Sequence, residues 1–427
     1  MSEIFLIILQ LLFIIFIFNF STYEITKKLE IKNFNIFEIM SVNIILFLNL
    51  LLFLSLLNIT LNYIFIIIIL ITLLGFIKNF KSKFLELNVN KIFIISLLLL
   101  SFVISIDLAS TIDLGWDAKI FGFFKTLNFY QNNNVINLVN LNVRDYPHLG
   151  SLLWSLHWKF PFNYNEYFGR ISYIVIYLIS IFTFYFDLKI TKITKLIIIF
   201  LTVLLTYEYS LISGLQEILI FSLILMATKF AFILFYEKSN INQSKLIFYI
   251  LLITNAACWI KNEGLIFMLI FNFSLLFIHI KNKLKIQLIV GSVLIFIIRA
   301  FYLYYLQIDF ESSQFQSTFM LSNFDSFQIM KDIKIIIFYM IVYFIEIPIY
   351  LFFVVMVFWM LINKKRDSDF YKFFIIFGIL NFLFIIFSFL FNMNDVEWQV
   401  RVGLKRVMFE TAGFYLLPIL IAVRGKK

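Results

Sequence analysis

The chain has 427 residues, of which 62% are hydrophobic and only 14% are charged. An ordinary soluble domain has about a quarter of its residues charged, so this composition excludes a soluble globular protein. The net charge is +10. Because the lysines lie in short segments between apolar runs, the charge indicates orientation in a membrane, and we expect no nucleic-acid partner.

Long apolar runs recur along the whole chain. Each run is a candidate transmembrane helix, which needs about 20 predominantly apolar residues. We therefore predict an all-α polytopic membrane protein with about 13 transmembrane helices. The predicted spans are, in chain order, 4–20, 38–57, 61–78, 92–107, 171–186, 196–212, 218–236, 246–260, 264–280, 286–306, 335–360, 371–391 and 407–423. No basic residue precedes the first run, so we expect a retained helix rather than a signal peptide.

The basic residues are distributed unevenly between the two sides of this map. With the N-terminus outside, the cytoplasmic segments hold 22 of the 35 Lys and Arg residues and the outer segments hold 11. The remaining two, Lys229 and Arg299, fall inside spans; we expect Lys229 to snorkel toward the cytoplasm. The excess of positive charge inside selects this orientation. The short lysine-rich cytoplasmic loops are then topology signals and contacts for anionic membrane lipids.

The unusual polar segments all fall on the predicted outer side. They are the long loop 108–170, "SGLQE" at 213–217, "KNEG" at 261–264 and "MNDVEWQVRVGLKR" at 393–406. These segments are far apart in sequence, yet the topology brings them to one face of the bilayer. We therefore expect an active site at the outer membrane surface.

Two acidic residues, Asp113 and Asp117, follow the span 92–107 within "TIDLGWDAKIFGFFKTLNFY". Residues four apart share one face of a helix, and the stretch after Asp117 is typical of an amphipathic helix in the interface. A partly desolvated carboxylate has a raised proton affinity, which suits a general base acting on a sugar hydroxyl. The alternative is that the pair only caps and solubilises the loop helix.

The other candidates are basic residues and their neighbours. Lys261 and Glu263 lie between two apolar runs, where charges are costly unless they face a wet cavity or a ligand; the alternative is a tight hairpin. Arg401, Lys405 and Arg406 lie on the outer side against the orientation rule. An Arg side chain offers a fork to a phosphate; the alternative, which we accept for Lys405, is snorkelling.

Tyr146 and His148 belong to the polar turn "RDYPHLGSLLWS", in which Pro147 fixes the backbone. They are candidates for substrate binding, with a plain junction between loop and helix as the alternative. The single cysteine, Cys258, excludes an internal disulfide and a cysteine metal cluster. We find no cluster of ligands that demands a metal.

Five motifs in this order resemble a bacterial branch of the polytopic glycosyltransferases of the GT-C fold, the class of protein O-mannosyltransferases and aminoarabinose transferases. They are "DLGWDAKIFGFFK", "YPHLGSLLW", "SGLQEILIF", "KNEGLIF" and "RVMFETAGFYLLPI". The resemblance covers about 107 to 420, so we divide the chain into three N-terminal helices at 1–91 and a GT-C-like region at 92–427. It implies a polyprenyl-phosphate sugar as donor.

By position, the resemblance implies that Asp113 is the catalytic acidic residue. Many relatives carry a second acid where this chain has Leu114, which leaves Asp117 as a rival. Glu217 matches an acidic position in the turn with glycine. Lys261 and Glu263 match the hairpin motif of the family, and Arg406 matches the basic residue near the lipid phosphate.

The expected function is inverting transfer of a sugar from the lipid phosphate to a hydroxyl of a glycan, lipid or protein, at the outer face of the bacterial plasma membrane. No cofactor is required, and Mg²⁺ or Mn²⁺ is an option seen in some relatives. The alternatives are a lipid-linked sugar transporter or flippase and an O-antigen polymerase or ligase. Transporters concentrate polar groups at mid-membrane on broken helices, whereas here they gather at one face.

Overall fold

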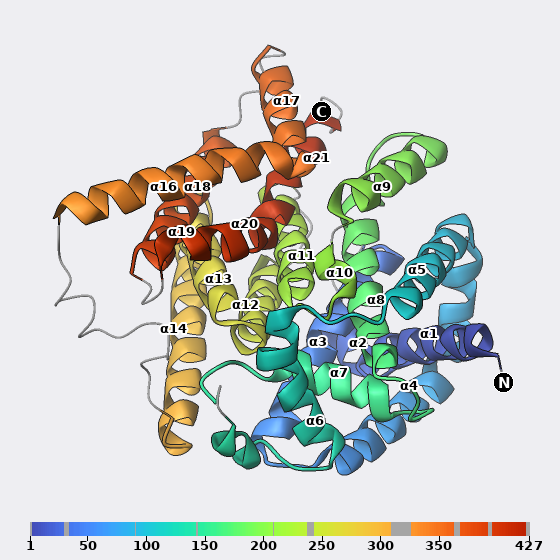
Figure 1. Cartoon of the computed structure of the whole chain (residues 1–427). Helices are drawn as coiled ribbons and strands as arrows, with labels where there is room; N and C mark the ends of the chain where they lie inside the picture. Colours follow the sequence, from blue (N-terminus) through green and yellow to red (C-terminus); the bar gives the residue numbers. More distant parts are fainter. Residues whose placement is uncertain are drawn as a thin grey trace.

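The computed structural model describes residues 2–29, 34–89, 91–141, 144–207, 209–236, 243–308, 326–362, 368–391 and 395–423, and every regular element in these ranges is a helix (Figure 1). The longer helices are α1 (Glu3–Phe20), α3 (Ile36–Leu56), α4 (Leu61–Val89), α5 (Lys91–Thr111), α7 (Leu149–Lys159), α8 (Tyr167–Tyr185), α9 (Lys192–Thr206), α11 (Glu217–Tyr236), α12 (Gln243–Ile260), α13 (Asn262–Leu275), α14 (Asn282–Tyr305), α16 (Ser326–Glu346), α17 (Pro348–Ile362) and α18 (Ser368–Leu390). The shorter ones are α2 (Tyr23–Leu29), η1 (Ala118–Phe123), α6 (Phe124–Tyr130), η2 (Ile136–Asn140), α10 (Tyr209–Ile212), α19 (Val396–Gln399), η3 (Val400–Leu404), α20 (Lys405–Ala412), η4 (Gly413–Leu416) and α21 (Leu417–Val423).

Ten helices in the described ranges are long and apolar enough to cross a membrane, and a bent pair raises the number to eleven. This is the architecture of a multi-pass membrane protein. Ten of the predicted spans coincide with these helices, the last of them as a continuous run of α19, η3, α20, η4 and α21. The predicted total of 13 is not reached, because three spans differ from the structure.

The three differences have local causes. The predicted span 335–360 is two helices, α16 and α17, that meet at 80°. Pro348 begins the second helix, where its missing N–H costs nothing. The span 264–280 is the 14-residue helix α13, and the span 196–212 is the 15-residue helix α9 followed by α10. Neither α9 nor α13 has the roughly 20 residues that a straight crossing needs.

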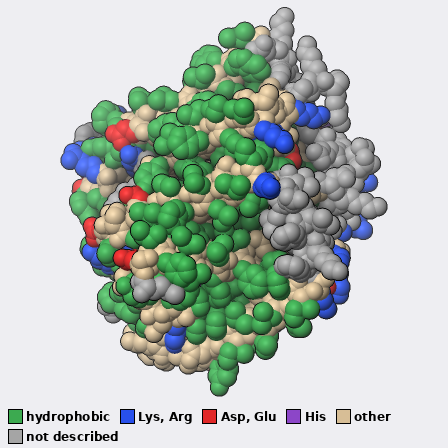
Figure 2. Space-filling view, turned by 90° about the vertical axis from the view of Figure 1, so that its right-hand side faces the viewer, with side chains coloured by type: hydrophobic (Ala, Val, Ile, Leu, Met, Phe, Trp, Pro, Cys, Tyr) green, Lys and Arg blue, Asp and Glu red, His purple; other side chains and the backbone are tan. Residues whose placement is uncertain are grey.

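The centre of the bundle is formed by α8 and α11 (Figure 1), whose apolar windows are 100% and 94% buried. At the edge, α14 is only 17% buried and turns a row of apolar side chains outward. The face shown in Figure 2 is likewise covered mostly by hydrophobic side chains. An apolar exterior over a packed interior is what contact with lipid tails requires, since lipid does not drive apolar side chains inward.

Close helix packing depends on small residues at some contacts. Gly169 of α8 is one of them: a Cβ atom there would lie 2.1 Å from the carbonyl oxygen of Trp154 on α7. The indole N–H of Trp154 donates to the carbonyl of Glu166 at 3.0 Å. Helix α7, which belongs to the predicted outer loop, therefore packs closely against the central helix α8 at Trp154.

The N-terminal helices share the same core. α3 packs against both α8 and α12, and α1 packs against α8. The side-chain amide of Gln10 donates to the carbonyl of His157 at 2.7 Å. Apolar residues of α1 and α3 belong to one continuous hydrophobic cluster with those of α8 and α11. The helices before and after residue 91 therefore share one hydrophobic core.

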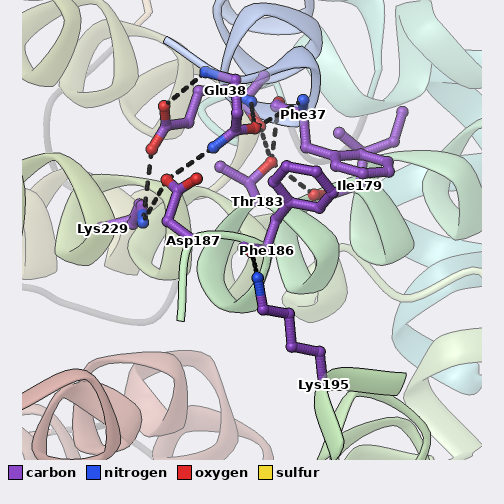
Figure 3. Close-up of polar contacts among 10 residues, drawn as sticks. Phe37, Glu38, Ile179, Thr183, Phe186, Asp187, Lys195 and Lys229 are labelled. Carbon is purple, nitrogen blue, oxygen red and sulfur yellow. Dashed lines mark hydrogen bonds and ion pairs between the residues drawn. The ribbon is translucent and has the colours of Figure 1, made fainter. Parts of the chain in front are cut away.

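A buried ion-pair network joins α3, the end of α8 and α11 (Figure 3). The ammonium of Lys229 lies 3.4 Å from Oε1 of Glu38 and 3.1 Å from Oδ2 of Asp187. Asn35 completes the network: its side chain donates to Asp187 at 2.7 Å and its backbone N–H donates to Oε2 of Glu38 at 3.0 Å. We call these four residues the Lys229 cluster. The side chain of Lys229 is 3% exposed, and its ammonium is paired with two carboxylates, Glu38 and Asp187, that border the predicted cytoplasmic segments.

Candidate active site

Two of the sequence motifs meet through their backbones. The N–H of Gly115 donates to the carbonyl of Ser213 at 2.9 Å. Gly214 has φ +79°, a conformation that favours glycine, and a Cβ atom there would lie 2.9 Å from the side chain of Leu114. The turn after α5 and the turn before α11 therefore lie in direct contact.

Arg170 of α8 fixes both of these turns. Its side chain is 1% exposed, and its guanidinium donates to the carbonyl of Asp113 at 3.3 Å and to the carbonyl of Ile212. The carboxylate of Glu166, one helical turn earlier, balances its charge. Five donors in a rigid fork suit this bridging task. Sequence reasoning did not assign this role to Arg170.

The ion pair between Arg406 and Asp117 joins the first motif to the last. Nη2 of Arg406 lies 2.5 Å from Oδ2 of Asp117. Nη1 of the same guanidinium lies 3.7 Å from Oε1 of Glu217, the first residue of α11. Three motifs separated by about 100 residues or more in the chain thus meet at one Arg side chain.

Lys261 is the hub of the deeper part of this network. Its ammonium lies 3.2 Å from Oε1 of Glu217 and 3.8 Å from Oε1 of Glu263, and it contacts Oε1 of Glu410 on α20. The side chain of Lys261 is 8% exposed and that of Glu410 is fully buried. We call the six residues Asp117, Glu217, Lys261, Glu263, Arg406 and Glu410 the Lys261 cluster.

Local backbone features place these side chains. Lys261 has an extended backbone, φ −151° and ψ 148°, at the break between α12 and α13. The break is tight, because a Cβ atom on Gly264 would lie 2.7 Å from the carbonyl of Ala257. Arg299 of α14 braces it by donating to the carbonyl of Cys258 at 2.5 Å and to the side chain of Asn262.

Wide π-helical turns flank both members of the outer ion pair. Asp117 directly precedes η1, and η3 ends two residues before Arg406. Such turns are rare in proteins and are found frequently at functional sites. Because such turns flank both partners of one ion pair, they favour a functional site in this region.

The Lys261 cluster has hydrogen-bonding capacity that the described residues do not use. Three of its buried atoms lack a hydrogen-bond partner there: Oε2 of Glu263, Oε2 of Glu410 and Nε of Arg406. Leaving such an atom unpaired costs about 1–3 kcal/mol. The cluster therefore offers two acceptors and one donor to a ligand. It also holds four carboxylates against two cations, so any anion must compete with a carboxylate for those cations.

The remaining predicted residues lie outside the cluster. The side chain of Asp113 is 65% exposed and its carboxylate lies 3.9 Å from Lys119. Arg401 is also exposed and pairs with Glu397. Residues 393 and 394 of the predicted outer segment lie outside the described ranges. Of the two predicted catalytic acids, the structure thus brings only Asp117 to the Lys261 cluster.

Tyr146 and His148 line a pocket together with Trp259 and Arg299. Burial, followed by the charge of the Glu263 carboxylate, raises the pKa of Tyr146 well above its usual value. Burial and the nearby charge of Lys125 lower the pKa of His148 to about 3. His148 is therefore a neutral ring at physiological pH, and its Nε2 lies 3.1 Å from the hydroxyl of Ser55 on α3.

In the part of the chain that the structure describes, no group of three or more His, Cys, Asp and Glu side chains is arranged to hold a metal ion. In comparisons with known proteins, no protein-family model, no curated protein and no solved structure matches this chain. The geometry of the Lys261 cluster and the sequence motifs are therefore the basis for the function.

Proposed function

We propose that the chain is an integral membrane glycosyltransferase of the GT-C type. It transfers a sugar from a polyprenyl-phosphate donor to an acceptor hydroxyl, with inversion, at the extracytoplasmic face of the bacterial plasma membrane. The observation that carries the proposal is the Lys261 cluster, in which carboxylates and cations from four distant motifs meet in a network with a buried centre and a half-buried rim. Ionisable groups held inside a membrane bundle are expensive, and function is the usual reason for them.

Asp117 is the preferred general base, because it belongs to the cluster whereas Asp113 faces outward beside Lys119. The acceptor oxygen attacks the anomeric carbon from the side opposite the phosphate, and its proton passes to Asp117. The bond from the anomeric carbon to the phosphate oxygen breaks, and its electron pair leaves with the polyprenyl phosphate. Arg406 and Lys261 stabilise that charge, and preorganised charges act strongly in a site that excludes water.

The other members of the cluster position these groups. Glu217 and Glu410 hold the ammonium of Lys261 from two different helices. The unpaired oxygens of Glu263 and Glu410 are suited to accept hydrogen bonds from sugar hydroxyls. Tyr146 and His148 form the neighbouring wall, and Arg401 is a further candidate to contact the lipid phosphate at the membrane surface. Mg²⁺ or Mn²⁺ is optional in this mechanism.

The proposal is tested by measuring release of polyprenyl phosphate from a polyprenyl-phosphate sugar by the purified protein in lipid nanodiscs. Positioned proton transfer typically contributes about 10²–10⁴-fold in rate. We expect Asp117→Asn to lose turnover by about that factor while retaining donor binding. Asp113→Asn is the matched control, four residues earlier and exposed, and should lose far less.

Three results would redirect the assignment. Normal turnover in Asp117→Asn with an inactive Asp113→Asn would return the base to Asp113. Absence of release by the wild type, together with movement of the intact lipid across the membrane of proteoliposomes, would favour the lipid-linked sugar flippase. An O-antigen polymerase or ligase would be recognised by a lipid diphosphate as leaving group.

A further inference from the structure

We propose that the phosphate of the bound donor displaces Asp117 from Arg406, so that the base becomes available only when the donor is in place. This inference rests on the proposed function and adds a donor-dependent step to it. It assigns two roles to Arg406: it holds the base while the site is empty and it binds the phosphate when the site is filled.

The Arg406–Asp117 pair lies at the accessible rim of the cluster. The side chains of Arg406 and Asp117 are 25% and 28% exposed, whereas those of Glu217, Lys261 and Glu410 are between 0% and 8% exposed. A lipid phosphate that enters from the membrane surface therefore meets Arg406 before it meets Lys261.

The guanidinium of Arg406 has little room for a phosphate while Asp117 is bound. Nη2 contacts Asp117 at 2.5 Å, and Nη1 faces Glu217 at 3.7 Å. Nε is buried without a partner among the described residues. A phosphate engages an Arg side chain through two parallel N–H donors. Binding through Nε and Nη2, which lie on one edge of the fork, requires Asp117 to leave.

Charge balance selects Asp117 as the carboxylate that moves. The cluster already has four carboxylates for two cations, so an added phosphate must replace one of them at a cation. Glu217 is retained by Lys261 at 3.2 Å as well as by Arg406. The ion pair that Asp117 makes is with Arg406. Displacing Asp117 breaks one ion pair at the rim of the cluster, which costs less than separating a fully buried pair.

Displacement also explains how the carboxylate reaches the acceptor. A general base must lie within hydrogen-bond reach of the proton that it removes. Paired with Arg406, Oδ2 of Asp117 is directed at the guanidinium. Once the phosphate has taken that position, the carboxylate is available to the acceptor hydroxyl on the opposite side of the anomeric carbon. The donor thus prepares the base for its own reaction.

The test is the affinity for polyprenyl phosphate, the unreactive product, measured by calorimetry on the full-length protein in nanodiscs. Because Asp117 competes with the phosphate, Asp117→Asn should bind it about three- to tenfold more tightly than the wild type, although the variant has lost turnover. Asp113→Asn should bind it with wild-type affinity. In the double variant Asp117→Asn/Arg406→Gln the gain should disappear.

Each other outcome overturns the displacement. Equal or weaker binding by Asp117→Asn, with wild-type turnover intact, would refute it and leave the proposed glycosyltransferase standing. A gain that persists without Arg406 would show that Asp117 acts as a distant charge. If the wild type neither binds polyprenyl phosphate nor releases it from a donor, the proposed function itself fails.

Discussion

Two buried lysines at different places in the bundle give a comparison within one molecule. Lys229 and Lys261 are 3% and 8% exposed, and each contacts carboxylates from more than one element. In the Lys229 cluster, none of the described buried polar atoms lacks a hydrogen-bond partner, whereas the Lys261 cluster has three that do. The described buried polar atoms of the Lys229 cluster are fully hydrogen-bonded. Those of the Lys261 cluster would be fully hydrogen-bonded only with a ligand present.

The difference shows which feature of a buried ion pair points to a ligand. Burying charges is costly whether or not they have a function, so burial by itself does not distinguish the two clusters. In the Lys229 cluster, Asn35 contributes the donors that complete the carboxylates of Glu38 and Asp187. In the Lys261 cluster, one oxygen of Glu263 and one of Glu410 stay open. Unused hydrogen-bonding capacity is therefore the difference between the two clusters that favours a ligand at the Lys261 cluster.

Replacing each lysine by methionine should give the largest contrast. Removing one partner of a buried ion pair typically costs about 3–5 kcal/mol of stability, and both Lys229→Met and Lys261→Met should show such a loss in thermal unfolding. Only Lys261→Met should also lose transfer by about 10²–10³-fold, because it removes a charge that stabilises the leaving phosphate. The measurement is turnover per folded molecule.

Wild-type turnover per folded molecule in both lysine variants would break the comparison. In that case Lys261 would have only a structural role, like Lys229. The leaving phosphate would then have to be stabilised by Arg406, with Arg401 as the further candidate. A loss in Lys229→Met as large as that in Lys261→Met would instead show that turnover follows bundle integrity.

Glutamine at the buried acids gives the next effect. Glu410→Gln and Glu38→Gln each weaken one lysine contact and keep the side-chain volume. Of these two acids, only Glu410 has a buried oxygen without a hydrogen-bond partner among the described residues. We therefore expect Glu410→Gln, and not Glu38→Gln, to lower kcat/KM for the sugar donor by about ten- to a hundredfold. The control Glu38→Gln should leave kcat/KM within a factor of about three. An equal effect of the two variants would remove the sugar contact assigned to Glu410.

Much of the fold could be predicted from local sequence. A transmembrane helix is specified by a continuous apolar stretch of sufficient length, and ten such helices appear where the hydropathy pattern indicates them. The bend at Pro348 carried a local signal too, since a proline interrupts the hydrogen bonding of a straight helix. The predicted span 335–360 nevertheless includes Pro348, because a hydropathy pattern responds to apolar composition and not to the loss of a backbone hydrogen bond.

The site was predictable only in part. The positive-inside rule predicts that the polar motifs share one face of the membrane. The structure brings Asp117, Glu217, Lys261, Glu263 and Arg406 together. Which residues pair is a property of helix packing and is not encoded locally. This is why the partners of Lys229 were missed, and why the sequence left Asp113 and Asp117 as rivals for the catalytic acid.

Glu410 was missed although its sequence signal was present. An acidic residue inside a predicted span is by itself an indication of function, and it stands four positions after Arg406, on the same face of a helix. Within the motif "RVMFETAGFYLLPI", the resemblance assigned a function to Arg406 and none to Glu410.

Lys125 is a buried lysine outside both clusters, and its replacement should give the smallest of the predicted effects. It is a third buried lysine, 1% exposed, whose ammonium donates to the carbonyl of Tyr146. The charged groups that act on it are Asp145, which favours the ammonium, and Arg299, which opposes it. Burial is the largest influence and lowers the pKa of Lys125 to about 7. Lys125 is therefore about half deprotonated near pH 7.

The pH dependence of stability follows from that pKa. In the unfolded chain Lys125 titrates near 10.5, so between about pH 7 and 10 the unfolded state binds more protons than the folded state, and wild-type stability rises with pH. Lys125→Met removes this titration. Its Tm relative to the wild type should therefore be highest near pH 6 and should fall by a few degrees by pH 9, as measured by thermal unfolding in detergent. Lys229→Met, which removes a paired lysine, should show no such decline over this range. A Tm difference for Lys125→Met that stays constant with pH would mean that Lys125 keeps its proton in the folded protein, as a lysine with a carboxylate partner does.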